Sequence, residues 1–326
     1  MIDGPGGAAT GHGSSAQGVL GFGCASLQLA VSREANMRIL GAAWDGGVRW
    51  FDVARSYSYG AAEGLLGRFL GQRRDEAVVV TKLGLWPPRR LVRSAPVRAV
   101  ARTAVRLVPA AKSRAVATAD ALAPRPDFSI TRARQSLHTS LRELRTDHVD
   151  ALLLHEASLS DVADDGLRAW LSACVQQGKV RRWGIATSDL SVTSAICAEV
   201  PAATAIVQVP DSLLDPAGDH LPDLPDGSMV SHSMLRTDLP KLRTWLGADP
   251  ARLATWSARL DADVTDQGVL AQLVLARAVS RPGRPVVLFS SRDVRRCTQA
   301  ASSRRGCSPE AMASFGALLD AVRTSS

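Results

Sequence analysis

Short apolar runs alternate with helix-like segments along this chain from residue 18 onwards, and this alternation limits the fold more than any other feature. Each run is rich in β-branched residues and is bounded by turn residues, which predicts a strand. Helical spacing fills most of the intervals, as in residues 33–45, which follow Ser32 as a candidate N-cap, and in residues 129–144. The expected strands are 18–23, 48–52, 77–82, 149–154, 180–185, 204–209, 228–232 and 285–289.

Eight strands with helices between them predict a (β/α)8 TIM barrel, which is an α/β fold, and we expect a single barrel domain over residues 18–326. The competing architecture is a doubly wound sheet, which usually carries a Gly-x-Gly-x-x-Gly turn after its first strand. Here that stretch reads Gly21-Phe-Gly23-Cys-Ala-Ser26 and lacks the third glycine. The barrel is therefore the predicted fold, and residues 309–323 have the spacing of one further helix.

The positive charge is concentrated in one segment, residues 85–128, which interrupts the alternation after the third strand. The net charge of the chain is +8, yet this segment alone carries nine basic residues against two acidic ones. Arginines recur every fourth residue at Arg98, Arg102 and Arg106 beside an apolar side, which predicts a basic amphipathic helix inserted into the barrel. A solvated helix, a lid for anionic substrates and a surface for acidic lipid or polysaccharide all fit residues 89–106.

Composition narrows the class of protein. An apolar fraction of 46% supports a large core, and no run of about 18 uncharged apolar residues suits a membrane span. Residues 1–17 are rich in Gly, Ala and Ser, so we expect a disordered tail and no signal peptide. The scattered cysteines predict buried thiols in a cytoplasmic protein without a metal site. They are Cys24, Cys174, Cys197, Cys297 and Cys307.

Ionisable side chains follow several of the expected strands. Asp52 ends the second, Lys82 the third and His155 follows the fourth, while Tyr57 comes five residues after Asp52. In a parallel barrel the carboxyl ends of the strands meet at one mouth, where catalytic groups gather. The pattern therefore predicts an enzyme.

Together these residues belong to motifs that resemble the aldo-keto reductase family. The resemblance covers roughly residues 18–301, in the order and spacing of that family. It rests on Gly47-Val-Arg-Trp-Phe-Asp52, Tyr57, Gly60-Ala-Ala-Glu63, Thr81-Lys82, Asp150-Ala-Leu-Leu-Leu-His155 and Gly178-Lys-Val-Arg-Arg-Trp-Gly184. It implies a barrel that binds NADP(H) and moves a hydride between the nicotinamide and a carbonyl or an alcohol.

The resemblance makes Tyr57 the general acid, with Lys82 and Asp52 tuning it and His155 beside the carbonyl oxygen. The chemistry agrees, because a carbonyl gaining a hydride needs a proton donor at its oxygen, and a free phenol with a pKa near ~10 exchanges protons poorly. A nearby ammonium lowers that pKa, and an imidazole can donate a second hydrogen bond to the forming alkoxide. Tyr59, seven residues after Asp52, is the alternative to Tyr57 and otherwise a wall of the substrate pocket.

Cofactor contacts follow from the same resemblance, with departures. An Ala186-Thr187 pair stands where the family has Ser-Asn, and Gln299 and Ala300 replace the clamp's usual acidic residue and asparagine. Ser291 and two arginines after the last strand suit a 2′-phosphate, which favours NADP over NAD. His232 stands where an aromatic ring commonly stacks on the nicotinamide. The implied cofactor residues are Gly23, Cys24, Thr187, Ser188, Gln208, His232, Ser291, Arg292 and Arg296.

Other classes of function stay open at this point. A non-catalytic nucleotide sensor of the same fold is one, and a membrane-surface or polyanion-binding protein using residues 89–106 is another. A short-chain dehydrogenase would need Tyr-x-x-x-Lys, which neither Tyr57 nor Tyr59 provides. Nucleic acid is not expected as a partner, because no aromatic residues alternate with the arginines. The predicted substrate is a small aldehyde or ketone, and sugar-like compounds are among the candidates.

Overall fold

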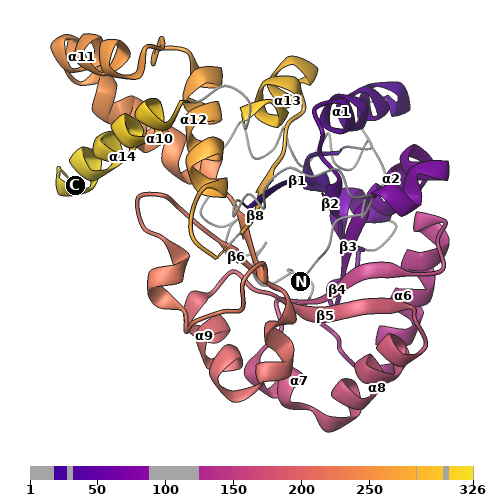
Figure 1. Cartoon of the computed structure of the whole chain (residues 1–326). Coiled ribbons are helices and arrows are strands. Elements are labelled where there is room, and N and C mark those ends of the chain that lie inside the picture. The colour runs from indigo at the N-terminus through magenta and orange to yellow at the C-terminus, as the bar shows by residue number, and fades with distance from the viewer. Residues whose placement is uncertain (1–17, 28–31, 88–124, 284, 304–307, 326) are drawn as a thin grey trace, which may run out of the picture.

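Eight parallel strands close into a barrel in the computed structural model, which describes residues 18–27, 32–87, 125–283, 285–303 and 308–325 (Figure 1). Each strand pairs with the next one along the chain, and β1 pairs with β8 to complete the ring. The closed ring confirms the predicted barrel and excludes a doubly wound open sheet. The strands are β1 (Val19–Gly23), β2 (Trp50–Asp52), β3 (Val78–Leu83), β4 (Val149–His155), β5 (Val180–Ala186), β6 (Val207–Pro210), β7 (Met229–His232) and β8 (Val286–Phe289).

Helices cover the outside of the barrel (Figure 1). Ser32 caps the first of them as predicted, because its hydroxyl accepts a hydrogen bond of 3.1 Å from the Ala35 N–H. Asp189, Asp266 and Asp293 cap later helices in the same way. The helices are α1 (Arg33–Asp45), α2 (Ala62–Leu70), α6 (Ile130–Leu144), α7 (Leu159–Ala163), α8 (Asp165–Gln176), α9 (Leu190–Glu199), α10 (Met234–Gly247), α11 (Pro250–Leu260), α12 (Gln267–Val279), α13 (Val294–Ala301) and α14 (Pro309–Thr324).

The interior of the barrel explains why polar side chains meet at its mouth. Side chains of a strand alternate between the inside of the barrel and the surrounding helices. Asp52, Lys82 and His155 each lie two positions beyond an inward apolar residue of the same strand, so they also face inward, at the carboxyl end. The inward apolar cluster consists of Trp50, Val78, Val80, Ala151, Leu153, Ala186, Ile206, Val230, Val286 and Leu288.

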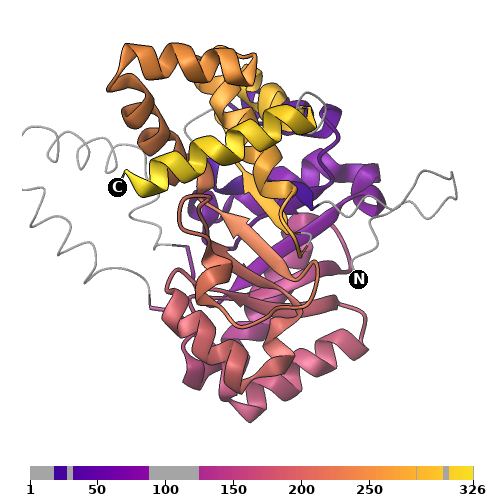
Figure 2. The ribbon, with the colours of Figure 1, turned by 60° about the vertical axis from the view of Figure 1, so that its left-hand side comes forward.

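A lobe of four helices, α10, α11, α12 and α14, lies beside the barrel (Figure 2). The predicted helix at residues 309–323 is α14, and it packs against α11 and α12. Near the end of α14, the Arg323 guanidinium donates a hydrogen bond to the Leu213 carbonyl, in the loop after β6. The lobe is thereby attached to a loop at the mouth of the barrel.

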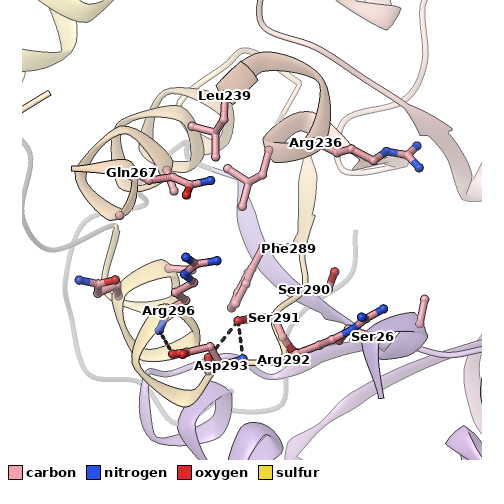
Figure 3. Close-up of a pocket in the computed structure, with 16 residues that line it drawn as sticks. Ser26, Arg236, Leu239, Gln267, Phe289, Ser290, Ser291, Arg292, Asp293 and Arg296 are labelled. Carbon is pink, nitrogen blue, oxygen red and sulfur yellow. Dashed lines mark hydrogen bonds between the residues drawn. The ribbon is translucent and has the colours of Figure 1, made fainter. Parts of the chain in front are cut away.

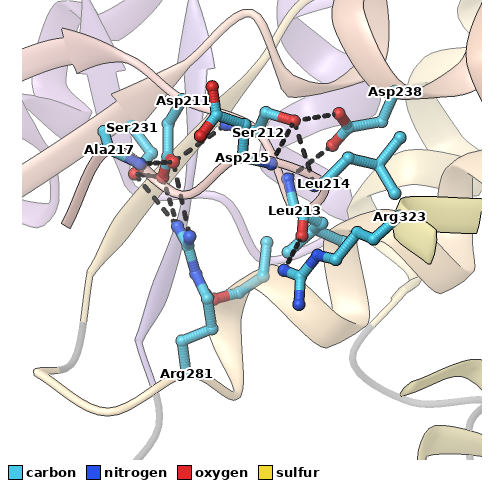
Figure 4. Close-up of polar contacts among 11 residues, drawn as sticks. Asp211, Ser212, Leu213, Leu214, Asp215, Ala217, Ser231, Asp238, Arg281 and Arg323 are labelled. Atoms are coloured by element: carbon cyan, nitrogen blue, oxygen red, sulfur yellow. Dashed lines mark hydrogen bonds and ion pairs between the residues drawn. The ribbon is translucent and has the colours of Figure 1, made fainter. Parts of the chain in front are cut away.

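Two buried carboxylates hold that loop in place (Figure 4). Asp211 accepts a hydrogen bond of 2.6 Å from the Ser231 hydroxyl and forms an ion pair with Arg281. Asp238, from α10, accepts a hydrogen bond of 2.8 Å from the Leu213 N–H. Burial favours the neutral acid, but Arg281 and the hydrogen-bond donors outweigh it and hold the pKa of Asp211 below its ordinary value. The loop therefore depends on an ionised, paired carboxylate.

The chain leaves the barrel after β3 and returns to the same place. The Asp127 N–H donates a hydrogen bond of 3.0 Å to the Gly84 carbonyl, and the Phe128 ring packs against Gly84. Gly84 has a φ of +107°, a left-handed backbone that glycine adopts without strain. The predicted basic helix and most of the insertion 85–128 lie outside the described residues, as does the predicted tail 1–17. The division into tail, insertion and single domain stays a prediction.

Candidate active site

A buried ion pair forms the centre of the site. Lys82 Nζ lies 2.5 Å from Asp52 Oδ1 and 3.2 Å from the Val53 carbonyl oxygen. The two ionised side chains are only 1% and 3% exposed. Burial alone lowers the pKa of the Lys82 ammonium, but the Asp52 carboxylate and the Tyr57 hydroxyl outweigh burial and hold that pKa above its ordinary value. Lys82 is therefore a cation fixed inside the barrel.

Tyr57 lies directly beside this cation. Lys82 Nζ is 4.9 Å from the centre of the Tyr57 ring, and the same ring meets the His155 imidazole edge to face, with 6.1 Å between their centres. Burial raises the pKa of the phenol and the Lys82 charge opposes this, with a net shift upward. Lys82 thus acts on this pKa in the expected direction, but burial outweighs it. The phenol is protonated, which is the form that a proton donor needs.

A second buried ion pair holds the turn that carries Tyr57. The Arg55 guanidinium contacts the Glu63 carboxylate and donates a hydrogen bond of 3.1 Å to the Gly60 carbonyl. Glu63 also accepts a hydrogen bond of 2.7 Å from the Thr81 hydroxyl, next to Lys82 in β3. Neither Arg55 nor Glu63 was among the predicted site residues. An arginine before Tyr57 and a glutamate after it, eight residues apart, could have indicated this ion pair.

The alternative tyrosine occupies the same short turn. Ser58 and Tyr59 have left-handed backbones, with φ of 49° and 55°. The Ser58 hydroxyl donates to the Leu27 carbonyl, which attaches the turn to the loop after β1. Tyr59 is partly buried. The Tyr57 ring, for its part, contacts the imidazole of His155.

Two histidines at strand ends are neutral. Burial, with Lys82 and His232, lowers the pKa of His155 to about 3. Burial, with Lys82 and Arg236, lowers the pKa of His232 to about 4. At neutral pH each ring therefore carries one N–H donor and one acceptor nitrogen.

Gln208 presents an unused acceptor to the interior. It lies in β6, is 3% exposed, and its Oε1 has no hydrogen-bond partner among the described residues. Buried polar atoms are normally paired, so this oxygen fits a ligand amide. The two residues predicted to assist it are engaged within the chain. The Thr187 hydroxyl bonds to Thr193, and the Ser188 hydroxyl donates to Glu156 at 2.9 Å.

The first strand also ends at this mouth. Gly23 is its last residue and Cys24 is fully buried next to it. Burial raises the pKa of the Cys24 thiol, Asp52 raises it further, and Lys82 opposes both. Cys24 therefore lies close to the ion pair as a neutral thiol. The other described cysteines are buried as well, as expected.

A cavity of about 610 Å³ opens beside β8, between α10, α12 and α13 (Figure 3). It brings together all three residues predicted to clamp a phosphate: Ser291, Arg292 and Arg296. Arg236 and Gln267 line it from α10 and α12, and local sequence spacing did not single them out. Guanidinium groups and a helix N-terminus around one cavity suit a phosphate ester.

Two negative observations concern only the part of the chain that the structure describes. No group of His, Cys, Asp and Glu side chains there is arranged to hold a metal ion. None of the helices there is long and apolar enough to cross a membrane.

A closed parallel barrel with polar side chains gathered at its carboxyl-terminal mouth belongs to the (β/α)8 class of proteins. Within that class, the model of the aldo/keto reductase family matches residues 19–222. The chain belongs to the aldo/keto reductase family, as the motifs predicted.

Named relatives share parts of the chain. It is 34% identical over 147 residues to a D-threo-aldose 1-dehydrogenase of a Pseudomonas species, which is 44% of this chain and 41% of that protein. It is 44% identical over 68 residues to a pyridoxal 4-dehydrogenase of Microbacterium luteolum, which is 20% of each. The matches thus span less than half the length of these curated relatives.

Solved structures share the fold. An aldo/keto reductase from Klebsiella pneumoniae, in complex with NADP and acetate, superposes with a TM-score of 0.60 at 18% identity, over 94% of this chain and 91% of that one. A holo aldo-keto reductase from Bacillus halodurans gives a TM-score of 0.63 at 16% identity, over 93% and 91%. At this identity the likeness establishes the fold.

Proposed function

We propose that this protein is an NADP(H)-dependent oxidoreductase that reversibly reduces an aldehyde or ketone to an alcohol, with Tyr57 as the general acid and base. The observation that carries the proposal is the buried Lys82–Asp52 pair, at 2.5 Å, with Lys82 Nζ 4.9 Å from the Tyr57 ring. A cation beside a protonated phenol makes the phenolate left after proton donation less costly.

Each residue has a defined part in the reduction. NADPH, when bound, supplies the hydride. Tyr57 gives its proton to the carbonyl oxygen, and Lys82 stabilises the phenolate that remains. His155, neutral and in contact with Tyr57, donates a hydrogen bond to the same oxygen. In alcohol oxidation the Tyr57 phenolate takes the proton back. Asp52 keeps Lys82 charged throughout.

The residues present fit the dinucleotide at both ends. The unpaired Gln208 oxygen suits the nicotinamide amide, and the cavity with Ser291, Arg292 and Arg296 suits the adenosine 2′-phosphate. The Klebsiella pneumoniae reductase in complex with NADP supports this choice of cofactor. Thr187 and Ser188 are the weaker candidates, because their hydroxyls already have partners within the chain. His232 has a neutral ring at the nicotinamide end, and Gly23 and Cys24 line the end of the first strand.

The name of the Pseudomonas relative supports a sugar-like substrate. We propose a small hydroxylated aldehyde or the corresponding alcohol. A panel of aldoses, simple aldehydes, ketones and alcohols, followed at the nicotinamide absorbance with NADPH and with NADH, tests both substrate and cofactor. Turnover of at least one carbonyl, faster with NADPH, is expected. NADPH binding without turnover of any compound would contradict the proposal and favour a nucleotide sensor.

A further inference from the structure

A chain of hydrogen bonds joins the mouth of the barrel to the arginine-lined cavity. Arg236 Nη2 donates to Ser233 Oγ at 3.0 Å, and Ser233 Oγ lies 2.8 Å from His232 Nδ1. Arg236 is also one wall of the cavity that holds the predicted phosphate clamp. His232 is the last residue of β7, two positions after the inward Val230. Two consecutive hydrogen bonds therefore connect His232, at the mouth of the barrel, to Arg236, which lines the cavity.

The donors in this chain of hydrogen bonds favour one position for the proton of the His232 imidazole. A guanidinium can only donate, so Ser233 Oγ accepts from Arg236. Among the described residues, His232 Nδ1 is the one acceptor within hydrogen-bond distance of the Ser233 hydroxyl, so the arrangement favours donation of its hydrogen to that nitrogen. A neutral imidazole carries one proton, and with Nδ1 as acceptor that proton is on Nε2, at the far side of the ring from Ser233.

We infer that Ser233 and Arg236 are positioning residues that fix His232 as an Nε2–H donor at the mouth of the barrel and make it respond to an anion in the arginine-lined cavity. The inference rests on the proposed function for the identity of that anion, the 2′-phosphate of NADP(H). His232 then supplies a second imidazole N–H donor beside that of His155, suited to a substrate with an oxygen next to its carbonyl.

The backbone of Ser233 supports a positioning role. Its φ is 71°, in the left-handed region that costs a non-glycine residue free energy. It stands at the N-cap of α10, yet its hydroxyl caps no backbone N–H of that helix. The hydroxyl is turned instead to His232 and Arg236. A glycine would suit this backbone better, so the serine side chain is explained by its two contacts.

Four groups act on the charge of His232, one from each neighbouring element. Lys82 from β3 and Arg236 from α10 disfavour the imidazolium, His155 from β4 faces the same space, and Asp211 after β6 favours it. A phosphate bound in the cavity that Arg236 lines offsets part of the charge of one of the two repelling cations. Occupation of the cavity should therefore raise the pKa of His232, provided that Arg236 carries its charge.

The first experiment identifies the tautomer directly. Long-range ¹H–¹⁵N spectra of the ¹⁵N-labelled full chain, with His232 assigned by loss of its signals in His232→Gln, show which nitrogen carries the proton. Wild type should show Nε2–H. Ser233→Gly removes the hydroxyl and relaxes the backbone, so it should fold and show a mixture of tautomers. Arg236→Gln keeps an N–H donor for Ser233 and should keep the Nε2–H form.

The second experiment measures the coupling with 2′,5′-ADP, which carries the phosphates without the nicotinamide. In wild type its binding should move the pKa of His232 upward by roughly 1. Arg236→Gln should abolish that shift. Arg292→Gln, a change of equal charge in the same cavity, should weaken 2′,5′-ADP binding while the Nε2–H form stays.

Two results would overturn the inference: an Nδ1–H tautomer in wild type, or an unchanged tautomer in Ser233→Gly. The spectra are independent of turnover. If no carbonyl is reduced while His232 behaves as stated, the proposed function fails and the positioning of His232 stands. If carbonyls are reduced and His232 carries its proton on Nδ1, only the positioning fails.

Discussion

At the scale of the residue, one phenol is affected by opposing influences. Burial favours the protonated form of Tyr57 and Lys82 favours the phenolate. Burial has the larger effect, so the pKa of Tyr57 lies above its ordinary value. A proton donor with these neighbours is held in its donating form, and the conjugate base is stabilised as soon as it forms.

We expect Tyr57→Phe to reduce turnover of the best carbonyl by roughly 100-fold to 10,000-fold, since it removes the proposed proton donor. NADPH affinity, measured by fluorescence titration, should change little. Tyr59→Phe is the matched control and should keep most of the turnover. The opposite order of the two variants would assign the proton transfer to Tyr59.

Arg296→Ala should weaken NADPH binding by roughly 10-fold to 100-fold, because it removes a charge-assisted contact, and should leave NADH binding nearly unchanged. Arg295→Ala is the control, because Arg295 lies on the same helix and has the same charge but does not line the cavity. Titration calorimetry with both nucleotides measures the effect. Equal losses for NADPH and NADH would remove Arg296 from the phosphate site.

At the scale of the element, the alternation of side chains along each strand determines which residues face the mouth of the barrel. Inward positions recur every second residue, so β2, β3 and β4 each turn one ionisable side chain into the mouth. The loop after β6 depends on Asp211, whose side chain is 0% exposed and whose ion pair with Arg281 joins β6, β7 and the end of α12 (Figure 4). The Asp211–Arg281 pair is the ion pair among the contacts that hold this loop, and Asp238 adds hydrogen bonds from α10.

Arg281→Ala should lower the free energy of unfolding by about 3 kcal/mol, because it leaves a buried carboxylate without its cation. Arg281→Ala combined with Asp211→Asn should recover part of the loss. Arg168→Ala, which breaks an exposed pair with Asp165, should cost less than about 1 kcal/mol. Urea unfolding of the four proteins compares these values, and equal losses for Arg281→Ala and Arg168→Ala would contradict the role given to Asp211.

The neutral histidines of β4 and β7 give the fold a pH dependence. Their folded pKa values, about 3 for His155 and about 4 for His232, lie below the unfolded value near ~6.5. Between these values the unfolded chain binds more protons, so stability falls as the pH falls below about 6.5. We expect the melting temperature to drop between about pH 7 and pH 5, and to drop less in His155→Gln. A flat profile in wild type would show that folding does not lower the pKa values of these rings.

Sequence patterns predicted the strands better than they predicted the contacts between side chains. The eight strands were predictable because each is a short β-branched run between turns, and Asp52, Lys82 and His155 because they end such runs. Arg236 was not predictable, because only the folded position of α10 brings it to the cavity that Arg296 also lines. The net pKa of Tyr57 was also out of reach, because it depends on how deeply the folded chain buries the phenol.

At the scale of the whole molecule, the ring closes because its strands approach closely. At Gly184 in β5, a Cβ would lie 1.9 Å from the Ile206 carbonyl oxygen, which is backbone and cannot move aside. The pairing of β5 with β6 continues to Ala186 and Gln208, so this contact also sets the place of the unpaired Gln208 Oε1. One missing side chain thus supports both the closure and the site.

Gly184→Ala should therefore destabilise the protein by ~3 kcal/mol or more and reduce NADPH binding through Gln208. Gly316→Ala is the control: a Cβ there meets nothing within 4 Å, and alanine in the middle of α14 should raise stability by up to about 1 kcal/mol. Thermal unfolding of both variants measures the difference. A Gly184→Ala protein as stable as wild type would mean that β5 and β6 separate without cost.

The hydrogen bond between Asp127 and Gly84 has a consequence for how this protein can diversify. It brings the departure and return of a long excursion together at the carboxyl end of the strand that bears Lys82. Evolution can then lengthen, shorten or exchange the sequence between residues 87 and 125, while the spacing of the strands stays as it is.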